Sequence, residues 1–199
     1  GQNPLEWLEN NPLRYKKYKM ISTVFTDLTL YRNLVFRSQF AVDFSHTTGF
    51  SQSFPDYEPN LGEGSAARSS TDGLGLHLTN TLTYRFDKDN VHDFNFLLGH
   101  EWQDYHVEAF SVSTAGQTNS KLTDISTGTR ATSWTSTADS DYSRVSFFGR
   151  GEYNYADRYY AEVSVRTDGS SRFGKNNRWG VFGAVGFMWN LRNENFMTG

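Results

Sequence analysis

The sequence predicts an all-β protein, an antiparallel meander of about seven strands. Apolar and polar residues alternate in several segments, aromatic rings make up 16% of the chain, and short and long connections follow one another. A period of two is the pattern of a strand with one apolar and one polar face. We expect consecutive strands to pair, with helix confined to a turn or two near Pro4, where Asn3 is a suitable N-cap.

The clearest alternation lies in residues 143–154 and 159–167. In both segments most odd-numbered residues are apolar or small, and most even-numbered residues are polar or charged. Val163, for example, falls on the face opposite to Glu162 and Arg166. A face with full charges must meet water, so each strand is expected to present one wet and one apolar side.

Other strands with the same alternation are expected along the rest of the chain. Residues 1–199 are therefore predicted to form a single β-barrel segment. Strands are expected near residues 18–30, 34–46, 74–86, 93–105, 143–154, 159–167 and 179–190. Long loops are expected at residues 47–72, 108–141 and 168–177. The last strand alternates more weakly than the others.

The rhythm of the connections separates two all-β architectures. Short turns alternate with long loops, as in a transmembrane β-barrel, whose short turns lie on the periplasmic side. Strands of about 10 to 14 residues, at roughly 3.3 Å each, can cross a tilted outer membrane. Rings such as Tyr31, Phe86 and Tyr155 gather near the short turns, where an interfacial girdle belongs. The alternative is a soluble β-sandwich with one face of each strand in the core.

Composition excludes several classes of function. The net charge of −3 offers no basic field for nucleic acid. The absence of cysteine excludes disulfides and thiolate metal sites. No run of about 18 apolar residues is present, so no membrane-spanning helix is expected.

Residues 157–197 carry a resemblance to a known family. The run Asp168, Gly169, Ser170, Ser171, Arg172, Phe173 and Gly174, followed by Asn177, Arg178, Trp179 and Gly180, resembles a signature of SusC/RagA-type TonB-dependent outer-membrane transporters. Weaker echoes occur upstream at residues 3–5, 34–38, 79–84 and 98–103. The order and spacing of these motifs resemble the family from end to end of the chain.

The resemblance implies a fold and a function. It implies that the chain is a slice from the middle of a large transmembrane β-barrel of about 22 strands. It implies import of glycan or peptide fragments across the bacterial outer membrane, with a SusD-like surface lipoprotein as partner. TonB would act through parts of the complete protein outside this chain, and no cofactor is implied. A soluble carbohydrate-binding β-sandwich domain remains the alternative function.

The charged residues and the histidines are the candidates for catalysis or metal binding. Glu152 and Glu162 share a face on neighbouring strands, which could suggest the acid/base pair of a glycosidase. A lumen wall with paired charges explains them better, because a wide barrel requires polar residues inside. The five histidines form no ligand cluster by spacing. We therefore predict no catalytic residue, no metal site and no enzyme activity.

Loop aromatics are the candidate ligand contacts. Phe54, Tyr57 and Trp134 lie in polar sequence without an alternating partner, and sugar rings or peptides dock on such faces. Alternatively, these rings hold their own loops together. The Asp168 to Phe173 motif is expected to be a hydrogen-bonded loop corner, with Gly169 free to take a positive φ.

If the chain were isolated, it would expose apolar surface and unpaired strand edges to water. Seven strands have two free edges and a broad apolar face meant for lipid, and both favour association. We therefore expect the isolated chain to curl towards a small barrel, to pair with another copy, or to remain a partial barrel within the complete transporter.

Overall fold

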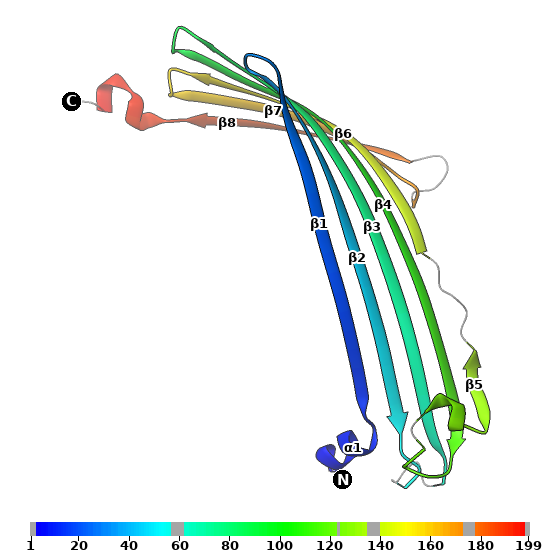
Figure 1. The fold of residues 1–199 in the computed structure, drawn as a ribbon. Coiled ribbons are helices and arrows are strands. Elements are labelled where there is room, and N and C mark those ends of the chain that lie inside the picture. The colour runs from blue at the N-terminus through cyan, green and yellow to red at the C-terminus, as the bar shows by residue number, and fades with distance from the viewer. Residues whose placement is uncertain (1–2, 57–61, 123, 135–139, 173–177, 198–199) are drawn as a thin grey trace. The chain divides into compact units, whose positions relative to one another are not determined.

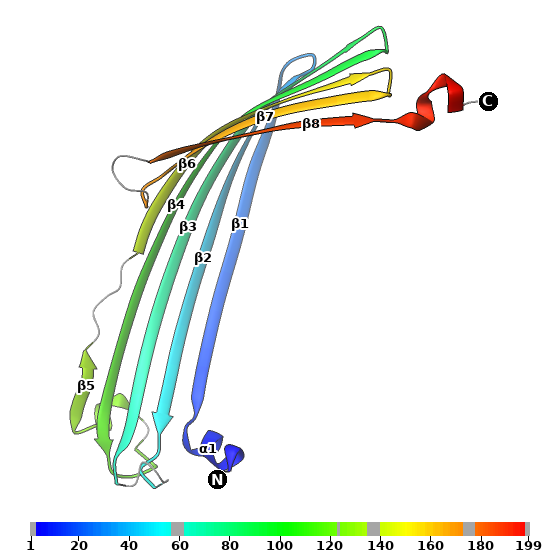
Figure 2. The same ribbon diagram turned by 180° about the vertical axis from the view of Figure 1, so that it is seen from behind.

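The computed structural model describes residues 3–56, 62–122, 124–134, 140–172 and 178–197. Eight antiparallel strands form one sheet in the order β1-β2-β3-β4-β6-β7-β8, and β5 pairs with β4 (Figure 1). The view from behind shows the same succession (Figure 2). The prediction of an antiparallel meander is confirmed, with β5 as an additional short strand.

The strands differ widely in length. They are β1 (Leu13–Tyr31), β2 (Leu34–Ser53), β3 (Gly64–Lys88), β4 (His92–Gln117), β5 (Arg130–Trp134), β6 (Ser140–Tyr155), β7 (Tyr159–Ser170) and β8 (Trp179–Trp189). The helical elements are α1 (Pro4–Asn10) and the 3₁₀ turns η1 (Ile125–Thr127), η2 (Leu191–Asn193) and η3 (Asn195–Met197). The Asn3 side chain caps α1 by accepting a hydrogen bond from the Leu5 amide at 3.1 Å, as predicted.

Among the described residues, no helix combines the length and the apolar character that crossing a membrane requires.

The strands extend well beyond the predicted limits. The loops predicted at residues 47–72, 108–141 and 168–177 shrink to connections over residues 54–63, 118–139 and 171–178, the second of which contains β5. Ser, Thr and Gly dominate these extensions, so no apolar face marks them. Their backbones continue to pair where both faces are polar, which alternation alone cannot predict.

Two of the short connections, each of three residues, contain a β-turn with positive φ at both central residues. Asp89 and Asn90 have φ of 61° and 53°, and Ala156 and Asp157 have φ of 50° and 54°. This is the type I′ geometry, whose twist matches that of the flanking strands. The short connection expected between the strands near residues 74–86 and 93–105 is thus a tight hairpin turn.

The chain divides into two compact units. The first contains residues 1–21, 43–74 and 106–141, and the second contains residues 22–42, 75–105 and 142–199. The first holds α1, β5 and the ends of β1 to β4 that carry the long connections. The second holds the hairpin turns and β6 to β8.

The sheet lacks the core of a sandwich. Ala66 and Ala115 are the buried apolar side chains among the described residues, whereas Phe96 is 48% exposed. A carbohydrate-binding sandwich would bury one face of each strand against a second sheet. That alternative is wrong for the described residues, since they form one sheet. Strands β1 and β8 end the strand order, so the sheet of the described residues is not closed.

Candidate functional site

Strands β6, β7 and β8 present two chemically distinct faces within the second unit. Gly151 pairs with Val163 and Val163 with Val185, so odd-numbered residues of the three strands share one face. Glu152 pairs with Glu162 and Glu162 with Gly186 on the other face. We call these the apolar face and the polar face. The alternation predicted from sequence therefore fixes the sides of the sheet.

Valines on the apolar face of β7 and β8 are well exposed. Val163 is 53% and Val185 is 82% exposed, whereas the Arg166 side chain on the polar face is only 34% exposed. Water-soluble proteins rarely expose a large contiguous apolar surface. Apolar-out and polar-in alternation is the arrangement of a transmembrane barrel wall.

Arg166 organises the polar face. Its Nη2 atom lies 2.6 Å from Glu101 Oε2 on β4, and its Nε donates to Asp168 Oδ1 at 2.8 Å. The guanidinium lies over the Phe148 ring at 5.3 Å from the centroid. The two carboxylates and the ring fix the orientation of this cation on the wall.

The paired carboxylates Glu152 and Glu162 differ in their surroundings. Glu152 accepts a hydrogen bond from Asn95 Nδ2 at 2.5 Å and lies 3.4 Å from Arg150 Nη2. Both glutamates line a hollow of about 650 Å³. Glu152 is thus engaged as a hydrogen-bonded wall residue, which is the role that sequence reasoning favoured over catalysis.

Aromatic rings gather beside the hairpin turn between β6 and β7. The ring centroids of Tyr155 and Tyr159 are 6.2 Å apart, and those of Tyr159 and Trp189 are 6.1 Å apart. The Tyr159 hydroxyl donates to Glu194 at 2.7 Å and Trp189 Nε1 donates to the same oxygen at 3.0 Å. Rings with a polar tip suit the membrane–water interface.

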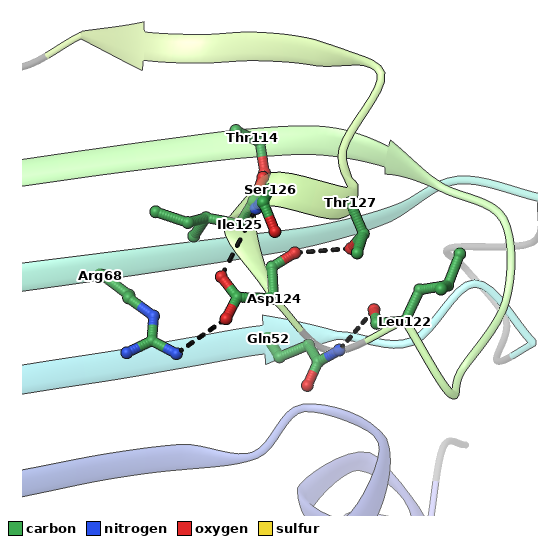
Figure 3. A network of polar contacts seen from close by, with 8 residues as sticks. All are labelled: Gln52, Arg68, Thr114, Leu122, Asp124, Ile125, Ser126 and Thr127. Carbon is green, nitrogen blue, oxygen red and sulfur yellow. Dashed lines mark hydrogen bonds and ion pairs between the residues drawn. The ribbon is translucent and has the colours of Figure 1, made fainter.

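A polar network holds the connection after β4 against the sheet in the first unit. Gln52 Nε2 donates to the Leu122 carbonyl at 3.2 Å, and Arg68 Nη2 lies 3.3 Å from Asp124 Oδ2 (Figure 3). No local pattern in the sequence indicates these contacts, because the partners are separated by 70 and 56 residues.

The three candidate aromatics have different outcomes. Phe54 follows β2, is half-buried and lines a hollow of about 430 Å³ with Arg14 and Arg68. Trp134 ends β5 opposite Val112, so it has a strand partner that was not predicted. Tyr57 lies outside the described residues. Ligand contact by these rings stays a prediction.

The Asp168 to Phe173 motif lies at the end of β7. Ser171 donates its amide to the Ser143 carbonyl at 2.9 Å and accepts from the Ser143 amide at 2.9 Å through its hydroxyl, which joins the motif to β6. Ser170 Oγ accepts from the Arg172 amide at 3.3 Å. Phe173 lies outside the described residues. A structural role for the motif stays a prediction that these contacts favour.

Glycine is needed at position 169 for a reason other than the expected positive φ. Its backbone is extended within β7, opposite Trp179. A Cβ at this position would lie 3.0 Å from the Trp179 ring. The glycine therefore admits a close ring, and the expectation of a left-handed conformation is wrong.

Comparisons with known proteins agree with this wall-like geometry. No protein-family model matches the chain. TonB-dependent receptor SusC of Bacteroides thetaiotaomicron is 35% identical over 107 residues, which are 54% of this chain and 10% of that protein. TonB-dependent receptor P26 of Formosa agariphila is 27% identical over 201 residues, covering 98% of this chain and 20% of that protein.

A solved structure is similar to this chain in fold as well as in sequence. The structure of the RagAB peptide transporter matches 95% of this chain and 21% of its own chain, with a TM-score of 0.85 and 29% identity. The chain spans about a fifth or less of these relatives. The open antiparallel sheet is therefore a slice of a β-barrel. Together the matches confirm the resemblance: the chain is similar to a segment of SusC/RagA-type TonB-dependent receptors.

Proposed function

We propose that this chain forms part of the barrel wall of a TonB-dependent transporter in the bacterial outer membrane. The observation that carries the proposal is the exposure of Val163 and Val185 on one face against the ion-paired Arg166 on the other. The apolar face meets lipid and the polar face lines the lumen. The likeness to receptors and transporters, and to no enzyme among the proteins named above, supports the same conclusion.

The proposed cargo is an oligomeric nutrient, a glycan or a peptide fragment. The solved relative is named a peptide transporter, which favours peptides, while the family resemblance also includes glycans. The proposed partners are a SusD-like surface lipoprotein, and TonB acting through parts of the complete protein outside this chain. A lumen wall with charges of both signs suits cargo with polar groups along its length.

Uptake by cells tests this proposal. A strain that lacks the gene for the complete transporter should lose growth on one class of oligomer, either peptides or oligosaccharides, and regain it with the intact gene. An affinity tag on the transporter should recover a SusD-like lipoprotein from detergent extracts. Unchanged growth on both classes, together with recovery of no lipoprotein, would refute the transport function.

A further inference from the structure

A hollow of about 430 Å³ lies in the first unit at the ends of β1, β2 and β3 that carry the long connections. Arg14 and Lys16 line it from β1, Phe50 from β2 and Arg68 from β3. The Arg68 guanidinium lies over the Phe50 ring at 5.2 Å from the centroid. The hollow thus brings three cations and an aromatic ring together on one sheet.

The hollow lies on the same side of the sheet as a row of exposed apolar residues. On β1, Arg14 and Lys16 are separated by even numbers of residues from Tyr18 and Met20, so all four share one face. Tyr18 is 65% and Met20 is 57% exposed. On β2, Phe50 shares a face with the exposed Phe44, because an even number of positions separates them. On β3, Arg68 shares a face with the exposed Leu74 for the same reason. These parts of both strands belong to the first unit.

The side chains along this face of β1 change from apolar to aromatic to basic, in the order that suits the acyl chains, the interface and the headgroups of a lipid monolayer. Met20 is apolar, Tyr18 is an aromatic with a polar tip, and Lys16 and Arg14 follow as cations. At roughly 3.3 Å per residue, Lys16 lies about 13 Å along the strand from Met20. Long basic side chains and tyrosines commonly take these positions at the boundary between acyl chains and headgroups.

The charge of the hollow is positive. Asp124 is the carboxylate among its described lining residues, and it lies 3.3 Å from Arg68. Three cations against one carboxylate leave a net charge of two positive units. Arg14 and Lys16 are exposed and have no ion pair within the described residues. Basic residues near a membrane surface attract anionic headgroups.

We propose that this hollow binds the phosphate groups of an anionic lipid in the outer leaflet, with Arg14 and Lys16 as the main phosphate ligands and Arg68 as the third cation. The inference rests on the proposed outer-membrane location. It adds a lipid site on the outside of the barrel wall, distinct from any cargo site in the lumen. Two neighbouring cations match a lipid that carries more than one phosphate charge.

Lipid titration of the complete transporter in detergent tests the site. The probe is bis-phosphorylated lipid A, and native mass spectrometry reports the lipid-bound fraction. Lys16→Gln should weaken binding about fivefold, the factor equivalent to about 1 kcal/mol per basic residue at an anionic surface. Arg14→Gln with Lys16→Gln should weaken it roughly 25-fold if the two contributions add. Lys17→Gln is the matched control, because Lys17 lies on the opposite face of β1.

Three outcomes would overturn the inference. They are equal weakening by Lys16→Gln and Lys17→Gln, binding of dephosphorylated lipid A as tight as that of the phosphorylated lipid, and displacement of lipid A by inorganic phosphate at equal concentration. None of these outcomes would be evidence against uptake by the intact transporter. Loss of uptake in the gene-deletion strain is scored separately, so failure of the lipid site and failure of the transport function can be told apart.

Discussion

Arg166 on β7 is joined to Glu101 on β4 although β6 lies between the two strands. The Nη2 to Oε2 distance is 2.6 Å, and the guanidinium crosses the Phe148 ring of β6 at 5.3 Å. One side chain therefore ties three consecutive neighbours of the sheet together on the polar face. Such a staple resists sliding of one strand past another, because a register shift would separate the charges.

Loss of this staple should destabilise the wall. Arg166→Met leaves Glu101 and Asp168 without their shared cation, and we expect the free energy of unfolding to fall by about 1–2 kcal/mol, the lower part of the range for charge-assisted bonds because the pair is partly exposed. Urea unfolding of the complete transporter in lipid vesicles measures it. Combining Arg166→Met with Glu101→Gln should cost less than the sum of the single changes. Strict additivity would show that the two groups are not coupled.

The paired glutamates of β6 and β7 should respond in opposite directions. Glu162→Gln removes a like charge directly opposite Glu152 and should stabilise the sheet by about 0.2–1 kcal/mol. Glu152→Gln instead weakens the bonds to Asn95 and Arg150, and should destabilise it. Urea midpoints of the two variants give the comparison. Stabilisation by both changes would mean that charge repulsion outweighs the contacts of Glu152.

The sequence predicts the central part of each strand because apolar and polar residues alternate between its two faces there. Val163 and Glu162 illustrate this, since their alternation alone fixes their sides. The strand extensions near Ser51 and Ser69 carry no such signal, because polar residues occupy both faces. The sequence also does not reveal which strands' residues meet. The register of β6 against β4, which brings Arg166 to Glu101, follows a long connection whose geometry has no signal in the sequence.

Single cysteines should report the two faces of the wall. The chain has no cysteine, so Val163→Cys and Ser164→Cys each introduce one thiol into it. In the complete transporter in lipid vesicles, a charged maleimide should label Ser164→Cys several times faster, because that thiol meets water in the lumen and Val163→Cys meets lipid. Gel-shift labelling rates provide the measurement. Equal rates in vesicles, persisting after detergent extraction, would contradict the assignment of the faces.

The segment after β8 should loosen in acid. Hydrogen bonds from Tyr159 and Trp189, together with the Arg158 guanidinium at 3.6 Å, lower the pKa of the Glu194 carboxyl below its ordinary value of 4.5. A folded-state pKa below the unfolded one contributes stability above about pH 4.5 that is lost as pH falls through the folded pKa. The protection factors of the amides in residues 190–197, which compare the exchange rate with the intrinsic rate at the same pH, should therefore fall on acidification.

Glu194→Gln is the control for that acid effect. The amide keeps the shape of the carboxyl but cannot titrate, so protection should be lower at neutral pH and nearly independent of pH between the two pKa values. Trp189 fluorescence offers a second readout, since its indole donates to Glu194 at 3.0 Å. An unchanged acid response in the variant would assign the titration to another group.

Gly99 on β4 should tolerate no side chain. A Cβ at this position would overlap the Phe148 ring, which is itself held beneath the Arg166 guanidinium. Gly99→Ala must push the ring away and so weaken the contact between Arg166 and Phe148, and we expect a loss of about 1–3 kcal/mol, as for other overpacked sites. Urea unfolding in vesicles measures the loss.

Gly151 on β6 is the matched control for Gly99. An added Cβ there would lie 3.6 Å from the Phe96 ring, an ordinary van der Waals distance. Gly151→Ala should therefore be neutral or slightly stabilising, since alanine also restricts the unfolded chain. A double change of Gly99→Ala with Phe148→Leu should recover part of the lost stability, because the smaller side chain removes the overlap. Equal losses for Gly99→Ala and Gly151→Ala would instead reflect a general effect of strand glycines and would remove the close ring as the explanation.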